Sequence, residues 1–290
     1  MQKLIYVPPT GNISDLKSCV TLTADEPYIL SEFSGVGGAE ASVISTTVPG
    51  MDGAYLQNVR IEPREIPCTV YVHGTDRQNM YESRYNLIKA LTPSKNLGWL
   101  YYQNDYIKVH CQALPRLPPD FTERIRLYNK AELTFWCPSP YWRAEKTKYE
   151  SIGYVQGSEF KFPFSFPIQF ASMKNEVTID YQGSIPAPVK ITIYGSAANP
   201  KIANATTGKY IALTQSLTEA QRLVIYTTRG DKSVRIVETG KGIQNAFQYI
   251  DPLSEFWELQ PGENIIRYSS DDDTQTTRVE IAYTELYSGV

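Results

Sequence analysis

The chain has 290 residues, of which 42% are hydrophobic and 20% charged, as in an ordinary water-soluble globular protein. This length favours two domains, because single hydrophobic cores rarely grow beyond about 250–300 residues. The net charge of −3 and the lack of any lysine- or arginine-rich run argue against specific nucleic-acid binding. No apolar run reaches the ~20 residues of a transmembrane helix or has the form of a signal peptide, so we expect no membrane insertion and folding in a cytoplasm.

The segment before residue 60 is rich in Gly, Ser and Pro and predicts strands separated by long loops. Gly35–Gly38 superficially resembles a phosphate-binding loop. It lacks the lysine of such loops and the strand-then-helix context that they need, so we expect a flexible loop instead.

One helix is predicted, over Asp76–Leu91, and Thr75 with Gln78 suits a capping box at its start. The helix should end before Pro93, because a residue that precedes proline resists helical dihedral angles. The apolar positions fall roughly on one stripe, as expected of a helix that packs on a sheet: Met80, Tyr81, Leu87, Ile88 and Leu91.

Strand patterns surround this helix. They cover Val70–His73, Gly98–Tyr102 and Tyr106–Cys111, with Asn104–Asp105 as the turn of an aromatic hairpin. Arg124–Trp136 alternates with interruptions, which predicts one long or bulged strand. The first domain, residues 1–142, is therefore predicted to be a sheet with a single helix packed on it.

The end of this domain is marked by Pro138 and Pro140, which remove hydrogen-bond donors and favour extended chain. Residues 143–175 are predicted to form a linker or strap. They contain phenylalanines at strict period two, which would all face one way in a strand: Phe160, Phe162, Phe164 and Phe166. Either an edge strand that covers a core or a strap between domains or subunits explains them.

Residues 176–290 read as strand after strand, with Gly, Asn, Asp or Pro in the turns between them. Short strands at this spacing predict a β-sandwich or jelly roll. Leu217–Arg222 is a weaker helix candidate, short enough to be only a turn. The predicted strands are Val177–Tyr181, Val189–Tyr194, Tyr210–Leu213, Leu223–Tyr226, Val234–Val237, Asn264–Ser269 and Arg278–Tyr283.

No catalytic, cofactor-binding or metal-ligating residues are predicted, and no cofactor. The only histidines are His73 and His110, both in predicted strands. His110 adjoins Cys111, and neighbouring strand residues point to opposite faces, which makes a poor nucleophile–base pair. Metal-ligand motifs with paired histidines are absent from the sequence. Acidic pairs for glycoside hydrolysis stay open, because sequence spacing does not identify them.

Three other groups have simple structural explanations. The cysteines, Cys19, Cys68, Cys111 and Cys137, lack CxxC spacing and should be reduced, mostly buried thiols. Asp271–Asp273 could in principle bind calcium but reads as a solvated turn between strands. Arg229–Asp231 suits a hairpin turn.

Several motifs, in order along most of the chain, resemble the distal tail proteins of siphophages. The strand end and Pro-x-Pro-aromatic junction at Leu133–Trp142 is the first that we noted. Others are Pro49–Gly53, Arg60–Ile66, Asn199–Gly208, Ser254–Asn264 and Val279–Tyr283, followed by the Tyr287–Val290 end. No single motif is specific, but the ordered set is a much stronger sign of the family than any one motif.

The resemblance implies a mainly β fold, with a tail-tube-like first domain that closes into a hexameric ring and a galectin-like sandwich at residues 176–290. It implies a non-enzymatic hub at the virion tail tip, from an intact phage or a prophage, assembled in the host bacterial cytoplasm. The partners would be the tail tube, tape-measure and tail-tip or tail-associated proteins, and DNA would pass through the ring.

Two alternatives remain at this point. The sandwich could bind a carbohydrate or another receptor through exposed aromatic residues, or the chain could be a cell-wall hydrolase. Glycan binding that depends on those aromatic residues would favour the first, and zymogram activity the second. Likeness to galectins concerns fold and brings no sugar-binding residues with it.

Overall fold

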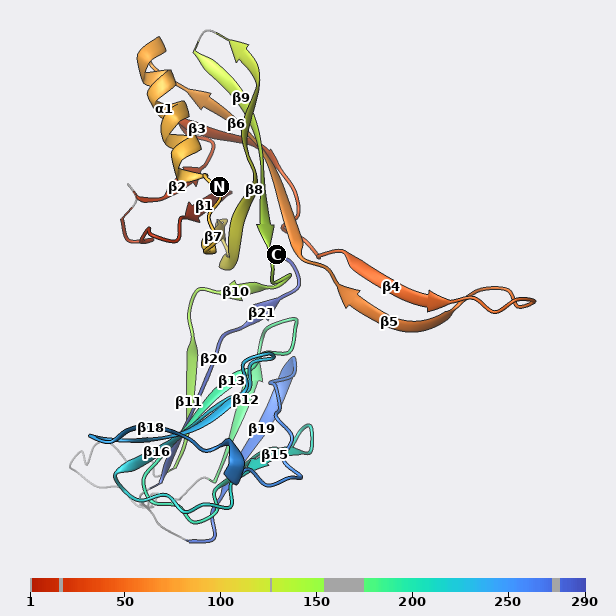
Figure 1. Cartoon of the computed structure of the whole chain (residues 1–290), viewed down its shortest axis with the longest axis vertical. Helices are drawn as coiled ribbons and strands as arrows, with labels where there is room; N and C mark the ends of the chain where they lie inside the picture. Colours follow the sequence, from red (N-terminus) through yellow and green to blue (C-terminus); the bar gives the residue numbers. More distant parts are fainter. Residues whose placement is uncertain (1, 16–17, 126, 154–174, 273–276) are drawn as a thin grey trace, which may run out of the picture. The chain divides into compact units, whose positions relative to one another are not determined.

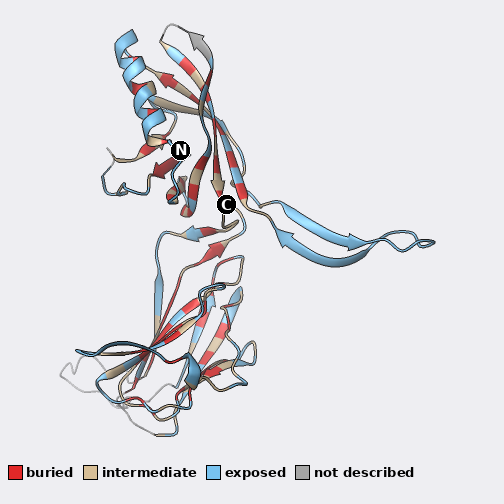
Figure 2. Cartoon of the chain, viewed as in Figure 1, coloured by how far each residue is buried: buried red, intermediate tan, exposed pale blue. Residues whose placement is uncertain are grey.

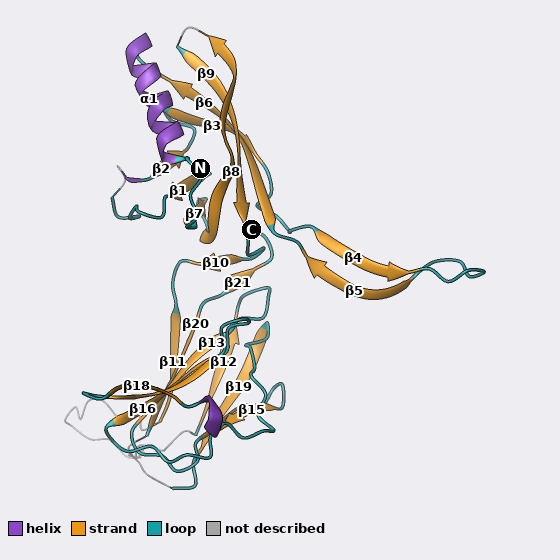
Figure 3. Ribbon diagram, viewed as in Figure 1, coloured by secondary structure: helices purple, strands orange, loops and turns teal. Residues whose placement is uncertain are grey.

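The computed structural model describes residues 2–15, 18–125, 127–153, 175–272 and 277–290. It divides into two units: unit 1 comprises Met1–Glu145 with Leu286–Val290, and unit 2 comprises Lys146–Glu285 (Figure 1). The protein is mainly β with one α-helix among the described residues, which confirms the predicted fold class (Figure 3). That helix is too short to cross a membrane, and the described residues include no other membrane-spanning candidate. The edge strand or strap predicted from the phenylalanines at 160–166 lies outside the described residues.

Unit 1 is built on a sheet in the order β2-β1-β7-β8-β9-β6-β3, with β10 paired to both β8 and β21. All neighbouring strands pair antiparallel. Its elements are β1 (Lys3–Val7), β2 (Val20–Leu22), β3 (Tyr28–Phe33), β4 (Ala41–Thr46), β5 (Tyr55–Ile61), β6 (Arg64–His73), α1 (Arg77–Ala90), β7 (Gly98–Gln103), β8 (Lys108–Ile125), β9 (Tyr128–Cys137), β10 (Trp142–Ala144) and β21 (Leu286–Tyr287).

The core of unit 1 follows from period-two alternation. Buried and more exposed positions alternate along β6 and β9, because successive strand side chains point to opposite faces (Figure 2). Ile66, Val70 and Val72 of β6 are fully buried, as are Ala131 and Phe135 of β9. The ring of Phe135 lies 5.2 Å from that of Tyr6 on β1, so the inner face of the sheet closes on itself.

The helix α1 forms where the sequence predicts it, but its start and its buried face differ from the prediction. The cap is Asp76, whose side chain accepts a hydrogen bond from the Asn79 amide at 2.8 Å, rather than Thr75 with Gln78. Met80 and Leu87 are buried as expected, whereas Tyr81 and Ile88 are exposed. Only a narrow strip of the helix therefore reaches the core.

The predicted single strand over Arg124–Trp136 is wrong. The chain reverses there, so that β8 ends at Ile125 and β9 begins at Tyr128, and the two strands pair antiparallel with several register shifts. The register shifts lie between Pro115 and Glu123 in β8, whereas β9 alternates regularly, so it is the reversal that interrupts the alternation of the predicted segment. β8 spans 18 residues and pairs with β7 through its first part and with β9 through its second, which joins the two halves of the sheet.

The side chain of Arg64, at the start of β6, holds four segments of unit 1 together. Its guanidinium donates to the carbonyls of Pro140, at 2.7 and 2.9 Å, and Ser288, at 2.5 Å. It also donates to two loop carbonyls, those of Gly35 and Gly37. The group is 2% exposed and lies 5.4 Å from the ring centre of Trp142. Arg64 therefore ties the last residues of the chain to segments more than two hundred positions earlier.

The Gly35–Gly38 loop is anchored rather than flexible, contrary to our expectation. Trp142 Nε1 donates to the Val36 carbonyl at 3.0 Å, and the Val290 amide donates to the same oxygen at 3.1 Å. Gly35 has φ +82° and lies so close to the Glu65 carbonyl that a Cβ atom would clash. Glycine is needed here for close packing, not for mobility.

Unit 2 contains two antiparallel sheets. One has the order β11-β20-β13-β16-β17-β18 and the other β12-β19-β14-β15. The elements are β11 (Lys148–Gly153), β12 (Glu176–Tyr181), β13 (Val189–Tyr194), β14 (Lys201–Asn204), β15 (Lys209–Ala212), β16 (Gln221–Tyr226), β17 (Ser233–Glu238), β18 (Gly242–Asn245), the 3-10 turn η2 (Phe247–Tyr249), β19 (Gly262–Ser269) and β20 (Arg278–Tyr283).

The two sheets pack face to face as a β-sandwich. Ile191 of one sheet and Ile266 of the other are fully buried, and the rings of Tyr181 and Tyr283 meet across the layers at 6.0 Å. A buried polar pair supports the smaller sheet, since Asn204 Nδ2 donates to Asn264 Oδ1 at 3.1 Å. All seven strands predicted for this region are present within a few residues of the expected bounds.

Three strands of unit 2 are not predicted from the sequence. β14 and β18 are four residues long, and β11 falls in the segment assigned to the linker at 143–175. The helix candidate Leu217–Arg222 is a bridge and a turn that leads into β16. The chain also crosses back at its end, because β21 pairs with β10 within unit 1. The predicted domain of residues 176–290 therefore lacks β11 and includes a terminal strand of unit 1.

Replacing Arg64 tests how far unit 1 depends on this side chain. We expect Arg64→Met to lower the free energy of unfolding by roughly 3 kcal/mol, because the part-buried carbonyl groups that the guanidinium binds lose their donor. Urea denaturation followed by tryptophan fluorescence would measure this, since Trp99, Trp136 and Trp142 all lie in unit 1. Arg116→Met, at an exposed position, is the matched control and should change little. Equal losses in both variants would contradict the assigned role.

Candidate assembly surfaces

The hairpin of β4 and β5 is a separate two-stranded sheet that projects from unit 1. These strands pair only with each other, and every residue in them is exposed (Figures 1 and 2). Large apolar side chains nevertheless occur along both strands and the connecting turn: Val43, Ile44, Val48, Met51, Tyr55, Leu56, Val59 and Ile61. An exposed apolar cluster of this size is typical of an interaction surface.

This hairpin lacks the packing that normally stabilises such an element. An isolated two-stranded hairpin is at best marginally stable in water, and exposed strand edges readily pair with other chains. Leu56 is 65% exposed and Val43 61%, so neither gains appreciable hydrophobic stabilisation within one copy of the chain. The arrangement suits a segment that is buried against a partner.

The base of the hairpin, in contrast, is firmly held. The Glu62 amide donates to the Glu40 carbonyl at 2.8 Å and closes the two arms. Arg64 follows two residues later and binds the Gly35 and Gly37 carbonyls on the approach to β4. A surface depression of about 390 Å³ lies at this base, with Gly35, Glu40, Arg64 and Trp136 among its lining. The base of the hairpin is therefore held to the rest of unit 1 by several hydrogen bonds.

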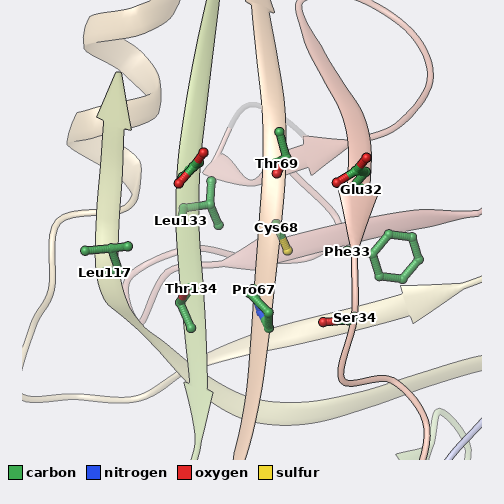
Figure 4. Close-up of a pocket in the computed structure, with 10 residues that line it drawn as sticks. Glu32, Phe33, Ser34, Pro67, Cys68, Thr69, Leu117, Leu133 and Thr134 are labelled. Atoms are coloured by element: carbon green, nitrogen blue, oxygen red, sulfur yellow. The ribbon is translucent and has the colours of Figure 1, made fainter. Parts of the chain in front are cut away.

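A second depression, of about 310 Å³, lies across β3, β6 and β9 (Figure 4). Pro67 and Thr69 come from β6, Glu32 from β3, and Glu132 and Thr134 from β9. It contains carboxylates but no histidine, and its thiol, Cys68, has its pKa raised to about 12 by burial. The site therefore has the shape of a docking face and lacks an activated nucleophile.

The helix α1 presents a third exposed apolar surface. Tyr81, Tyr85 and Ile88 recur at spacings that place them on one side of a helix, and all are exposed. Arg77 lies over the ring of Tyr81 at 5.9 Å. The sequence predicts Tyr81 and Ile88 on the buried stripe, whereas the structure places both outside it.

The two histidines do not form a catalytic arrangement. His73 Nδ1 lies 2.7 Å from a carboxylate oxygen of Glu26, and its ring packs in a tilted arrangement against Tyr128, with ring centres 4.4 Å apart. His110 lies between Trp99, at 5.1 Å, and Tyr101, at 5.2 Å, on the face of β8 opposite to Cys111. Burial, and then the nearby charge of Arg143, lower the pKa of His110 to about 4. His110 is thus a packed neutral imidazole.

The cysteines are free thiols, and all except the half-buried Cys19 are buried. Cys111 Sγ and Cys137 Sγ lie 3.4 Å apart on neighbouring strands. The hydrogen bond with Cys137, and then burial, raise the pKa of Cys111. A thiol in this state is a poor nucleophile and a good core residue.

The acidic run and the Arg-Gly-Asp turn also have structural roles. Asp272 Oδ1 accepts from the Ala198 amide at 2.8 Å and from Ser270 Oγ at 2.6 Å, while Asp271 binds Asn199. Asp231 donates its amide to the Thr228 carbonyl in a turn. Within the described part of the chain, no group of three or more His, Cys, Asp or Glu residues could hold a metal ion.

No site residue is predicted from the sequence, and neither is the hairpin of β4 and β5. A signal was available in the two apolar runs over Ala41–Thr46 and Tyr55–Ile61, which flank the turn-forming residues Pro49, Gly50 and Gly53. Gly50 and Gly53 both have positive φ, as the turn requires. What the sequence could not show is that none of the described residues covers these strands.

The two units together define a class of protein, the tail components of long-tailed bacteriophages. A family profile described as a phage tail protein RIFT-related domain matches residues 17–137, in unit 1. A second, described as the C-terminal domain of the siphovirus-type tail component, matches residues 182–287. The chain belongs to the siphophage distal tail protein family, as the motifs predict. It is thus a structural component of a phage tail.

A solved structure supports this fold. The Dit protein of phage SPP1, described as a paradigm of the hub of the adsorption apparatus in phages that infect Gram-positive bacteria, matches with a TM-score of 0.69. The identity is 12%, and the match covers 99% of each chain. Two structures of the phage P2 baseplate in its activated conformation, with Ca and with Sr, match at a TM-score of 0.49 and 13% and 14% identity. Both cover 100% of this chain and 99% of the other. No curated protein matches the chain.

The pKa of His110 predicts a dependence of stability on pH. Since the pKa of this imidazole is about 4 in the folded protein and 6.5 ordinarily, the unfolded chain binds more protons between these values. The contribution of His110 should be complete above pH 6.5 and be lost as the pH falls towards 4. We expect His110→Gln to lose less stability than the wild type over this range in thermal or urea denaturation. Parallel losses would show that other groups control the acid response.

Proposed function

We propose that this chain is a non-enzymatic hub at the tip of a siphophage tail, where copies close into a hexameric ring. The ring would join the tail tube above to the baseplate or adsorption proteins below and let DNA pass. The tail tube, tape-measure and tail-tip or tail-associated proteins would be its neighbours. Assembly would take place in the cytoplasm of the host bacterium. In this proposal, unit 1 is the tail-tube-like ring former and unit 2 the galectin-like sandwich.

The observation that carries the proposal is the exposed apolar hairpin β4–β5 on a fixed base. Its natural occupant is a second copy of the chain, because each copy offers the same projecting apolar arms, which pair only with each other among the described residues. Repeated contacts of this kind form a ring when the rotation between copies closes. Membership of a family of tail components supports the same role.

Charged substitutions on the hairpin should prevent assembly. We expect Val43→Glu with Leu56→Glu to shift the purified protein from rings to monomers in native mass spectrometry, because burying two new carboxylates at an interface is strongly unfavourable. Folding should be unaffected, since both side chains are exposed in the single copy. Unchanged circular dichroism would verify this.

The matched control is Tyr106→Glu, at a side chain of unit 1 that is 98% exposed and outside the hairpin. It should leave the rings intact. Rings formed equally by the hairpin variant would remove the hairpin from the interface. A wild-type protein that stays monomeric even when mixed with its tail-tube neighbour would overturn the ring itself.

Passage of DNA requires that the ring not retain it. The chain carries a net charge of −3, so a ring of several copies is acidic as a whole and should not attract phosphates. We expect purified rings not to retard duplex DNA in a gel-shift assay at moderate salt. Retardation that disappears only at high salt would argue against a channel lined by neutral or acidic residues.

A further inference from the structure

Unit 2 carries two neighbouring surface depressions that share one lysine. One, of about 340 Å³, lies between the turn at Thr207, the strand β15 and the loop that leads into β19. The other, of about 390 Å³, is formed by β17, β18 and the start of η2. Lys232 lines both of them. The strands β15 and β18, labelled in Figure 1, help to locate them within this unit.

A pair of stacked phenylalanines connects the two depressions. Phe247 lines one and Phe256 the other, and their rings stack with centres 5.9 Å apart and planes 13° from parallel. Lys232 Nζ lies 5.2 Å from the centre of the Phe256 ring. Phe247 is 46% exposed, so the stack is accessible from solvent. A flat apolar ridge of this kind can pack against the C–H face of a sugar or polyol, while the cation beside it meets an anion.

Cationic side chains line both depressions. Lys209 and Arg229 lie in the first and Arg235 in the second, in addition to Lys232. The only carboxylate in either described lining is Glu258, which is bound by Arg229 through two contacts of 3.0 Å. Lys232 and Arg235 have no carboxylate within ion-pair distance among the described residues. Lys209 pairs with Glu255 at 3.1 Å, so the positive charge of this surface comes from Lys232 and Arg235, although the chain as a whole is acidic.

The wall behind Phe256 is made of buried side chains. Trp257 is 1% exposed and lines the first depression, and its indole Nε1 is buried without a hydrogen-bond partner in the described structure. Buried indole N–H groups usually find an acceptor. Thr227, in the same lining, is fixed by its hydrogen bond to the Val189 carbonyl at 3.3 Å. The depression is thus preorganised rather than formed by loose surface side chains.

We propose that this surface binds an anionic carbohydrate polymer, in which sugars or polyols alternate with phosphate groups. The two depressions would each receive one unit of the polymer, with a phosphate between them at Lys232 and the carbon-rich faces against Phe247 and Phe256. A neutral polysaccharide would leave the cations without a function. A nucleic acid would need a longer basic track than four cations across two depressions provide.

Binding should be measured on the full-length protein with purified poly(glycerol phosphate) as the probe, by isothermal calorimetry at low and moderate salt. We expect Lys232→Glu to weaken binding at least about tenfold, because it removes the cation that both depressions share and adds repulsion. Phe256→Leu should weaken binding less than Lys232→Glu does. It should reduce the share of the affinity that remains when salt is added. Neutral dextran, polyphosphate and a single-stranded oligonucleotide should each bind the wild type much more weakly.

The matched control is Lys190→Glu. Lys190 is an exposed lysine of the same unit that lies over a tyrosine ring at 5.7 Å, and it lines neither depression. It should bind the probe as the wild type does. No binding by the wild type, or equal losses in both lysine variants, would overturn the proposal. So would polyphosphate or oligonucleotide binding as tight as that of the probe, since it would reveal charge attraction alone. None of these outcomes bears on ring formation.

Discussion

The structure of unit 1 depends on the burial of one guanidinium group. Arg64 occupies the first position of β6, where its side chain faces inward, and its donors meet carbonyls of the 35–37 loop, Pro140 and Ser288. Desolvation lowers the pKa of Arg64, but an arginine stays charged under all ordinary conditions. A buried charge is tolerated only when its donors are satisfied, so the four segments must be in place together. Arg64 therefore links the position of the last residues of the chain to the packing of unit 1.

A firm base and uncovered arms have a physical connection in the hairpin. Loops ordinarily lie on the surface and vary in position, whereas the hairpin leaves unit 1 from a loop fixed by Arg64, Trp142 and Val290. A held base lowers the entropy lost when the arms meet a partner. The same exposed apolar arms would be an aggregation hazard in a monomer. The proposed closed assembly would remove that hazard, because it would cover the arms in every copy.

Alternation along the sequence predicted most of the strands of unit 2 because each depends on local contrast between a buried and a solvated face. It failed where long-range contacts decide. β11 pairs with β20, and the interruptions in the alternation of Arg124–Trp136 conceal a reversal between β8 and β9. The exposed Tyr81 and Ile88 look like core residues in sequence, because periodicity does not distinguish a buried face from one that awaits a partner. The same ambiguity concealed the hairpin.

The sequence contains no recognisable catalytic motif, and the distribution of polar groups among the described residues agrees with this. The titratable residues that the structure perturbs most, His110, Cys68 and Cys111, are perturbed by burial in ways that suppress their reactivity. An active site instead pairs perturbed groups with a partner and an accessible cleft. Here the accessible depressions and the perturbed groups mostly lie apart, and where Cys68 joins the depression across β3, β6 and β9 its thiol is held protonated. A protein built in this way can act through what its surfaces contact, and the side chains left exposed on those surfaces are apolar on the hairpin and cationic beside the phenylalanine stack.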